Sequence, residues 1–324
     1  MKVLHLVLYS KGKVYDDMVN VTQPLYAHLR KVFDIQTYYY HYDESLSEPQ
    51  LDGMFLSLPG KETYIPGILE KTIAALDWFF QRRADDCKFD FVVRSNISSV
   101  INFQSLMKCL EFKVKAIFYA GTSVITSDFI HPLHGKVAER LLPLSFAHGT
   151  CLVMSSKAVF ELLGNLHLVN RITIDDVSLG AFFKEIEKPI IDLGGEIDTF
   201  DNLANIDNVC TFRNHTYHTD RKQDLENMRF QVDSLMQRYT KFPKNVALKT
   251  VWYFDKDITS NLVFLCKILP EWTSTGNNVI LDDLFGDPKP NQRKCLLLDF
   301  KDGQKYSQNA TLTFYWKSNN LFVN

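Results

Sequence analysis

Residues 88–103 read KFDFVVRSNISSVINF, and this stretch is the clearest guide to the fold. An apolar run up to Val93 ends in the polar cluster Arg94-Ser95-Asn96, and apolar residues resume at Val100. A short apolar run of this kind, with a helical pattern behind it, predicts a central strand of an α/β sheet over residues 89–94. Because ligands of such sheets bind beyond the carboxyl ends of the strands, the polar cluster is expected beside a ligand.

Similar patterns repeat along the first 240 residues. They predict strands near 3–9, 35–40, 53–57, 114–119 and 150–155. They predict helices near 21–32 and 102–110, a helix that begins at Pro66-Gly67, and a helix capped by Ser155 or Ser156. The tyrosines of 35–40 are expected to pack in the core. Alternating strands and helices predict an α/β fold with a mostly parallel sheet and helices on both faces.

The pattern changes after about residue 240. Residues 246–324 are strand-like and rich in turns, with Asp302-Gly303 as a candidate hairpin turn. We therefore predict two domains, an α/β domain over 1–240 and a small all-β, sandwich-like module over 246–324.

Composition excludes several classes of protein. The 324 residues carry a net charge of −2 and include no basic block, so a nucleic-acid surface is not expected. The six cysteines form no CxxC pair, which argues against a zinc cluster or a dense disulfide framework. No run of about 18 apolar residues predicts a membrane span, and the N-terminus is interpreted as a strand and not as a signal peptide. A small ligand and an intracellular location are expected.

Two adjacent carboxylates stand out in ITIDDVSLG, residues 172–180. Asp175 and Asp176 follow a strand-like run and precede a helix. Asp175 is suited to capping that helix, which leaves Asp176 to face a cleft as a general base. The alternative is a plain helix N-terminus, where acidic residues favour the helix dipole.

A basic, histidine-containing segment reads FRNHTYHTDRK over residues 212–222. Its candidate ligand-binding residues are Arg213, His215, His218, Arg221 and Lys222. Such side chains can clamp a diphosphate by charge-assisted hydrogen bonds, or a histidine can ligate a divalent ion. The alternative is an exposed polar loop whose cations pair with nearby aspartates. Arg94 and Asn96 carry the same ambiguity, since Arg94 can pair with a buried carboxylate and Asn96 can cap a helix.

The order of these motifs resembles GT-A-type glycosyltransferases of the galactosyltransferase and Fringe kind, especially divergent members encoded by large DNA viruses. The resemblance covers about residues 1–240 and rests on ETYIPGILEKTIAAL, FDFVVRSNISSVINF, FAHGTCLVMSSKAVFELL and DDVSLG. It implies a GT-A fold in which Asp176 matches the general base, Asp175 its acidic neighbour and Gly149 the family's strand glycine.

The sequence departs from the family at the DxD motif. Asn96-Ile97-Ser98 stands where the family has carboxylates that hold Mn²⁺ or Mg²⁺ against the diphosphate. Three alternatives follow: Arg94 and the basic segment neutralise the diphosphate directly, or Asn96 and a histidine such as His215 or His218 hold a metal weakly, or donor binding has been lost. The first two are favoured jointly, because the base motif remains.

The implied activity is transfer of a sugar from a nucleotide sugar, expected to be UDP-linked, to a hydroxyl of a glycan or protein, with inversion and with Asp176 as the base. The residues expected to bind the donor are Tyr9, Ser10, Lys71, Arg94, Asn96, Ser98, His148, Gly149, Arg213 and Arg221. The alternative is a catalytically silent, glycosyltransferase-like binding module. A nucleotidyltransferase is a third hypothesis, against which the sequence lacks GxGxxG and GxxxxGK[ST] motifs.

The C-terminal region resembles a small β module of unsettled function, found at the end of some J-domain-type proteins and in other proteins. The resemblance lies in DITSNLVFLCKILPEWTSTGNNVILDDLFGDPKPNQRKCLLLDF, where Gly286-Asp287-Pro288 is expected to form a turn. The module is expected to place the enzyme on a partner or to supply a homodimer surface. The viral resemblance implies a location in the host cytoplasm or the virion.

Overall fold

The computed structural model of the protein describes residues 2–81, 89–110, 117–188, 190–197, 209–215 and 221–239, and then 248–253, 256–260, 262, 271–273, 296–301, 305–308, 313–317 and 320–323. Its contacts divide the chain into two units, Met1–Asp233 and Ser234–Asn324. The division falls inside helix α6 (Arg221–Tyr239). The domain limits of 1–240 and 246–324 stay predictions.

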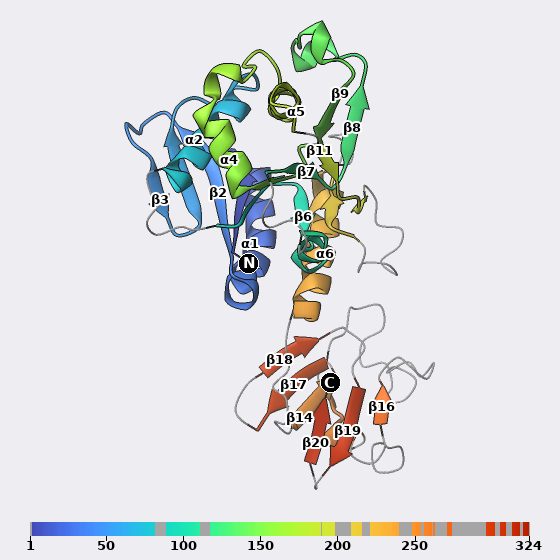
Figure 1. Ribbon diagram of the computed structural model, residues 1–324. Coiled ribbons are helices and arrows are strands. Elements are labelled where there is room, and N and C mark those ends of the chain that lie inside the picture. The colour runs from blue at the N-terminus through green and yellow to red at the C-terminus, as the bar shows by residue number, and fades with distance from the viewer. Residues whose placement is uncertain are drawn as a thin grey trace. The chain divides into compact units, whose positions relative to one another are not determined.

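The first unit is built on an eight-stranded sheet with the order β11-β7-β10-β5-β1-β2-β4-β3 (Figure 1). Its strands are β1 (Val3–Leu8), β2 (Ile35–Asp43), β3 (Gln50–Asp52), β4 (Phe55–Pro59), β5 (Phe91–Asn96), β7 (Tyr119–Gly121), β10 (Cys151–Ser155) and β11 (Ile190–Asp192). Strands β5, β1, β2 and β4 run parallel, whereas β10 is antiparallel to both of its neighbours, β5 and β7. The predicted α/β fold with a mostly parallel sheet is confirmed.

Helices cover both faces of this sheet (Figure 1). They are α1 (Lys13–Phe33), α2 (Gly67–Phe80), α3 (Phe103–Leu110), α4 (Ser156–Gly164) and α5 (Asp175–Glu185). Alternate side chains of β1 define the two faces. Leu4 and Leu6 belong to the core shared with α2, α4 and α5. His5 points the other way, with its ring 4.8 Å from that of Tyr26 on α1 and 5.0 Å from that of Phe103 on α3.

Several local predictions are confirmed. Helix α2 begins directly after Pro66, and the side chain of Ser155 caps α4 by accepting a hydrogen bond from the Ala158 amide. The tyrosines at 38, 39 and 40 are buried.

Two local predictions were wrong. Helix α1 begins at Lys13 and not near 21, with Asp16 in its first turn, where a carboxylate favours the helix dipole. Residues 172–174 form only a single bridge, Gly135 to Thr173, and not a strand.

Two smaller sheets accompany the main one in the first unit. A three-stranded sheet has the order β12-β13-β6, from Glu196–Ile197, Thr211–Arg213 and Ser99–Ile101. A β8–β9 pair joins Val124–Ser127 to Leu144–Ala147, and the short 3₁₀ helices are Pro132–His134, Glu139–Leu141 and Leu166–Leu168. The three-stranded sheet matters for the site because it carries the basic segment to the end of β5.

The second unit consists of two antiparallel sheets in its described part. One has the order β15-β14-β17-β18, from Lys256–Asp257, Leu248–Tyr253, Leu296–Phe300 and Lys305–Gln308. The other has the order β16-β19-β20, from Glu271–Thr273, Thr313–Lys317 and Asn320–Val323. The turns predicted at 302–303 and 286–288 lie outside the described residues, and the sandwich packing stays a prediction.

Across the described chain, no helix combines the length and the apolar character that a membrane crossing requires.

Buried His5 gives a first prediction. Its ring nitrogens contact the hydroxyls of Thr37 at 3.2 Å and Ser95 at 2.9 Å, and burial lowers its pKa from 6.5 to about 3. Since the folded pKa lies below the unfolded one, the unfolded state binds more protons between these values, and stability falls as the pH drops through that window. Between pH 7 and pH 5 we expect this group to remove about 2 kcal/mol of unfolding free energy.

The measurement is chemical denaturation of the wild type and of His5→Gln at both pH values. Glutamine does not titrate, so the variant should lose about 2 kcal/mol less on acidification. All other titrating groups cancel in this difference. Equal losses in the two proteins would show that His5 does not carry the effect.

Candidate active site

Arg94 organises the edge of the sheet where β1 and β5 end. Its side chain is 1% exposed, and its donors are used inside the protein. Nη1 donates to the Gly149 carbonyl at 2.6 Å and to Asn96 Oδ1 at 2.9 Å, while Nε donates to the Tyr40 hydroxyl at 3.3 Å. Nη2 lies 2.6 Å from Asp175 Oδ2. Burial lowers the pKa of Arg94, but Asp175 outweighs it and the net pKa is raised, so the guanidinium stays charged.

Asp175 is the first residue of α5, and its carboxylate faces Arg94 instead of capping the helix. The helix is preceded by Ile174 and lacks a side-chain cap. Oδ2 of Asp175 is buried, and although it forms the ion pair it has no aligned hydrogen bond. The expectation that Asp175 caps α5 was therefore wrong. A buried guanidinium needs a carboxylate partner more than this helix end needs a side-chain cap.

Asp176 is the second carboxylate, and it is 8% exposed. Oδ1 accepts a hydrogen bond from the Val177 amide at 2.8 Å. Burial and then the charge of Asp175 raise the pKa of Asp176 to about 6, while Arg94 and His148 act in the opposite direction. A carboxylate with this pKa is mostly ionised at neutral pH and still basic enough to take a proton, which suits a general base.

A cavity of about 380 Å³ opens beside these carboxylates. It is lined by Leu8, Ser10, Tyr15, Tyr64, Ile68, Asn96, Ile97, Ser98, His148, Thr150, Arg213, His215 and Arg221. Seven of the residues expected in the site line it: Ser10, Asn96, Ser98, His148, Arg213, His215 and Arg221. Gly149 places Asp176 near this cavity, because a methyl group on Gly149 would lie 3.6 Å from Asp176 Oδ2 and 3.7 Å from Nδ2 of Asn96, which lines the cavity.

The three-stranded sheet brings the basic segment to this cavity. Strand β13 pairs antiparallel with β6 so that Arg213 lies opposite Ser99. The backbone and side-chain amides of Asn214 both donate to the Ser98 carbonyl, each at 3.1 Å. Asn214 also exchanges two side-chain hydrogen bonds with Gln231 of α6, at 2.9 and 3.0 Å. These buried amides hold both the strand and the N-terminal part of α6 at the end of β5. Arg221 also pairs with buried Asp224 at 2.9 Å.

Sequence reasoning missed Glu196 on β12. Its Oε1 lies 3.3 Å from Nδ1 of His148, and its Oε2 accepts a hydrogen bond from the Thr150 hydroxyl. Burial alone would raise the pKa of Glu196, but the hydrogen bonds from His148 and Thr150 outweigh it and the pKa is lowered. Glu196 follows Gly194-Gly195 in a turn-rich stretch, where only the fold reveals its neighbours.

Four of the expected donor-binding residues lie at the base of the site and not on the cavity wall. Arg94 is enclosed as described, and Lys71 is fully buried, with its ammonium group 2.7 Å from both Glu62 oxygens and 3.0 Å from the Tyr9 carbonyl. The Tyr9 hydroxyl donates to Asp16. A methyl group on Gly149 would lie 3.2 Å from Arg94 Nη1 and 3.6 Å from Asp176 Oδ2. These contacts occupy polar groups of Arg94, Lys71 and Tyr9 within the protein, and their direct contact with a donor stays a prediction.

The described residues do not assemble a metal site. His215 lines the cavity, whereas His218 lies outside the described residues. Within the part of the chain that the structure describes, no three His, Cys, Asp or Glu side chains gather as metal ligands. Together with Asn96-Ile97-Ser98 at the DxD position, this donor set does not fit Mn²⁺ or Mg²⁺, which prefer several carboxylate oxygens.

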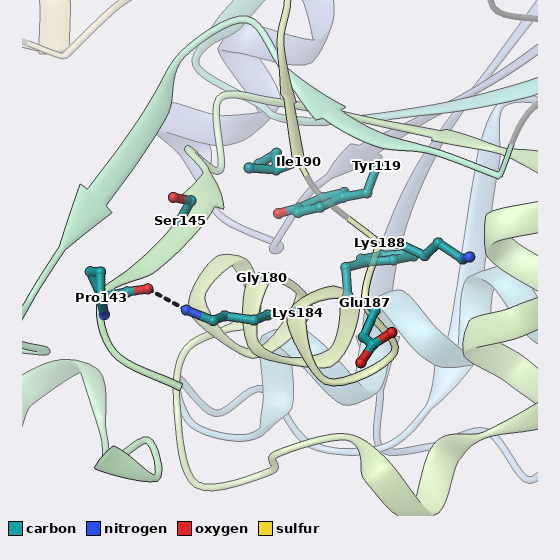
Figure 2. A pocket seen from close by; sticks show the side chains of 9 residues that line it. Tyr119, Pro143, Ser145, Gly180, Lys184, Glu187, Lys188 and Ile190 are labelled. Atoms are coloured by element: carbon teal, nitrogen blue, oxygen red, sulfur yellow. Dashed lines mark hydrogen bonds between the residues drawn. The ribbon is translucent and has the colours of Figure 1, made fainter. Parts of the chain in front are cut away.

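A second cavity of about 420 Å³ lies beside the C-terminal half of α5 (Figure 2). It is lined by Tyr119, Pro143, Ser145, Gly180, Phe183, Lys184, Glu187, Lys188 and Ile190. The Tyr119 and Phe183 rings stack at 4.7 Å, and the Lys184 ammonium group donates to the Pro143 carbonyl (Figure 2). It is the larger of the two cavities, but its lining contains neither the end of β5 nor the basic segment, both of which line the 380 Å³ cavity. The 380 Å³ cavity is therefore the candidate active site.

Among the known proteins compared with this chain, similar ones were found only among solved structures. No protein-family model matches the chain, and no curated protein matches it. A glycosyltransferase involved in glycosylation of the major capsid of PBCV-1 has 10% identity and a TM-score of 0.40, over 71% of this chain and 100% of that one. The galactosyltransferase LgtC, solved with donor and acceptor sugar analogs, has 14% identity and a TM-score of 0.40, over 75% and 98%.

A third similar structure is 2-C-methyl-D-erythritol 4-phosphate cytidylyltransferase from Thermus thermophilus, with 12% identity and a TM-score of 0.36 over 72% of this chain and 99% of that one. Solved glycosyltransferases are thus among the structures that this chain resembles, as the sequence motifs predict. Because identities and TM-scores are low, the functional proposal rests on the residues of the cavity.

The Arg94–Asp175 pair gives the second prediction. Removing one partner leaves a buried charge uncompensated, so Arg94→Met and Asp175→Asn should each lower the unfolding free energy by about 3–5 kcal/mol. The double variant should lose about 1–3 kcal/mol less than the sum of the two, because the second change relieves the first.

Denaturation of the four proteins measures this coupling. Arg94→Lys keeps the charge and should be milder than Arg94→Met, which provides a folded variant if the latter is too unstable. Strictly additive losses would show that the two side chains do not support each other.

Proposed function

We propose that the protein is a glycosyltransferase of GT-A type that transfers a sugar from a nucleoside diphosphate donor to a hydroxyl group. The observation that carries the proposal is one cavity with two chemically different sides. A buried carboxylate pair lies beside it, and His148, Arg213, His215 and Arg221 line it. Transfer from such a donor needs a base for the acceptor and positive charge for the leaving diphosphate.

Asp176 is proposed as the base. Its pKa of about 6 leaves it ionised at neutral pH, and its neighbour Asp175 is held by Arg94 and is not available for the same role. In an inverting transfer the acceptor oxygen attacks the anomeric carbon while Asp176 takes its proton. Arg94 acts through Asp175, Asn96 and the Gly149 carbonyl, and so fixes the base without touching the donor.

The diphosphate is proposed to lie against the cationic side. Guanidinium groups bind phosphate oxygens in bidentate fashion and stay charged at all relevant pH values. Arg213 and Arg221 supply these groups, while Tyr15 and Tyr64 offer partly exposed rings on the cavity wall for a nucleoside base. UDP is the expected nucleotide, as the family resemblance implies, and the titrations below test this choice.

Donor binding is the third prediction. Thermal-shift and calorimetric titrations with UDP-, GDP- and TDP-sugars should show one class binding, and the shift should survive EDTA because protein cations neutralise the diphosphate. A shift that requires Mn²⁺ would instead indicate a metal held with the help of His215 or His218. Glycan binding without any nucleotide response would contradict the transferase and favour a binding module.

The fourth prediction concerns Asp176. Asp176→Asn should abolish transfer, or hydrolysis of the bound nucleotide sugar, while leaving nucleotide affinity within about twofold. Loss of general-base catalysis typically costs about 10²–10⁴-fold in rate. In the wild type, the rate should rise with pH through about 6, because the base acts in its ionised form.

The matched control is Asp52→Asn, since Asp52 is an exposed carboxylate on β3. That variant should keep full activity and the same pH profile. Turnover by Asp176→Asn at the wild-type rate would refute the base assignment but leave the donor site in place.

A further inference from the structure

Glu196, His148 and Thr150 form a group beside the cavity. The proposed function names only His148 from this group, as a lining residue, and gives Glu196 and Thr150 no role. His148 precedes β10, Thr150 lies two residues on, and Glu196 comes from β12 of the small sheet. Nδ1 of His148 lies 3.3 Å from Glu196 Oε1 and 3.2 Å from the Thr150 hydroxyl, which itself donates to Glu196 Oε2. A carboxylate that engages one ring nitrogen fixes the orientation of the imidazole.

The other ring nitrogen of His148, Nε2, takes no part in these contacts. No hydrogen bond from the described residues reaches Nε2 of His148, and the residue lines the 380 Å³ cavity. Glu196 has a side-chain exposure of only 8%, and its charge is balanced by the hydrogen bonds from His148 and Thr150 and by nearby Arg213. The arrangement therefore holds Nε2 ready for a ligand in the cavity.

The position of His148 indicates which part of the ligand it meets. It is next to Gly149, whose Cα position faces Asp176 Oδ2, and its charge acts on Asp176. If Asp176 takes the acceptor proton, the anomeric carbon lies close by, and the β-phosphate is one bond from that carbon. Arg221 and His215 also line the cavity and come from other elements, Arg221 from α6 and His215 from the segment after β13.

We propose that His148, oriented by Glu196, binds the β-phosphate of the donor and donates a hydrogen bond to the leaving oxygen. This inference rests on the proposed function. In the transfer step the bond from the anomeric carbon to the β-phosphate oxygen breaks, and its electron pair stays on that oxygen. The acceptor oxygen forms the new bond to the carbon, and its proton passes to Asp176. The Nε2–H of His148 stays on the ring and donates a hydrogen bond to the new negative charge. Glu196 is a positioning residue.

The test is the selectivity between a diphosphate and a monophosphate. Calorimetry would compare UDP with UMP, and in parallel GDP with GMP and TDP with TMP, on the wild type and on His148→Gln, Glu196→Gln and the control His167→Gln. His167 is an exposed histidine away from the cavity. A charge-assisted hydrogen bond to the β-phosphate predicts that His148→Gln weakens UDP binding by about 10–100-fold and UMP binding by less than about twofold.

Glu196→Gln should reduce the same selectivity by a smaller factor, on the order of threefold to tenfold, because the ring remains but is held less firmly. His167→Gln should bind both nucleotides like the wild type. Equal weakening of UDP and UMP in His148→Gln would overturn the inference, since it would mean that His148 only shapes the cavity. A wild type that binds no nucleotide at all would instead refute the proposed function, and the wild-type titration alone separates the two failures.

Discussion

The buried charge of Arg94 is the constraint on which the active-site edge depends. A guanidinium with 1% exposure is tolerated only when its donors are matched, and the partners come from four segments of the chain. Tyr40 is on β2, Asn96 ends β5, Gly149 precedes β10 and Asp175 begins α5. The need to satisfy one side chain therefore fixes how these segments meet, and it places the start of α5 against the end of β5.

That constraint also explains the different roles of two adjacent carboxylates. Asp175 is paired with Arg94. Asp176 is more basic than an ordinary aspartate because it is buried and because the negative charge of Asp175 lies next to it. The sequence pattern alone treats the two residues almost alike. Their environments separate them, as happens at many sites where one carboxylate is structural and its neighbour reacts.

The sequence predicts much of this architecture and less of the site. The apolar run before Arg94, the Pro66 helix start and the Ser155 cap are local signals, so β5, α2 and α4 follow from them. The rule that ligands lie after parallel strands also leads to Ser10, Asn96 and Ser98. It says nothing of Glu196, because β12 joins the site through pairing with β13, a contact with no local pattern. Nor can it tell that Arg94 is enclosed, since burial of a charge depends on partners distant in sequence.

Strand direction adds one more consequence. Because β10 runs antiparallel to β5, the residues before it, and not those after it, reach the edge where β1 and β5 end. His148 and Gly149 thus arrive from the opposite chain direction to Asn96. The carboxylates are tied to the main sheet through Arg94, whereas Glu196, Arg213 and Arg221 are carried by the small sheet and α6. The cations that line the cavity and the carboxylates beside it therefore have separate backbone supports, and His148 links the two, since it contacts Glu196 and lowers the pKa of Asp176.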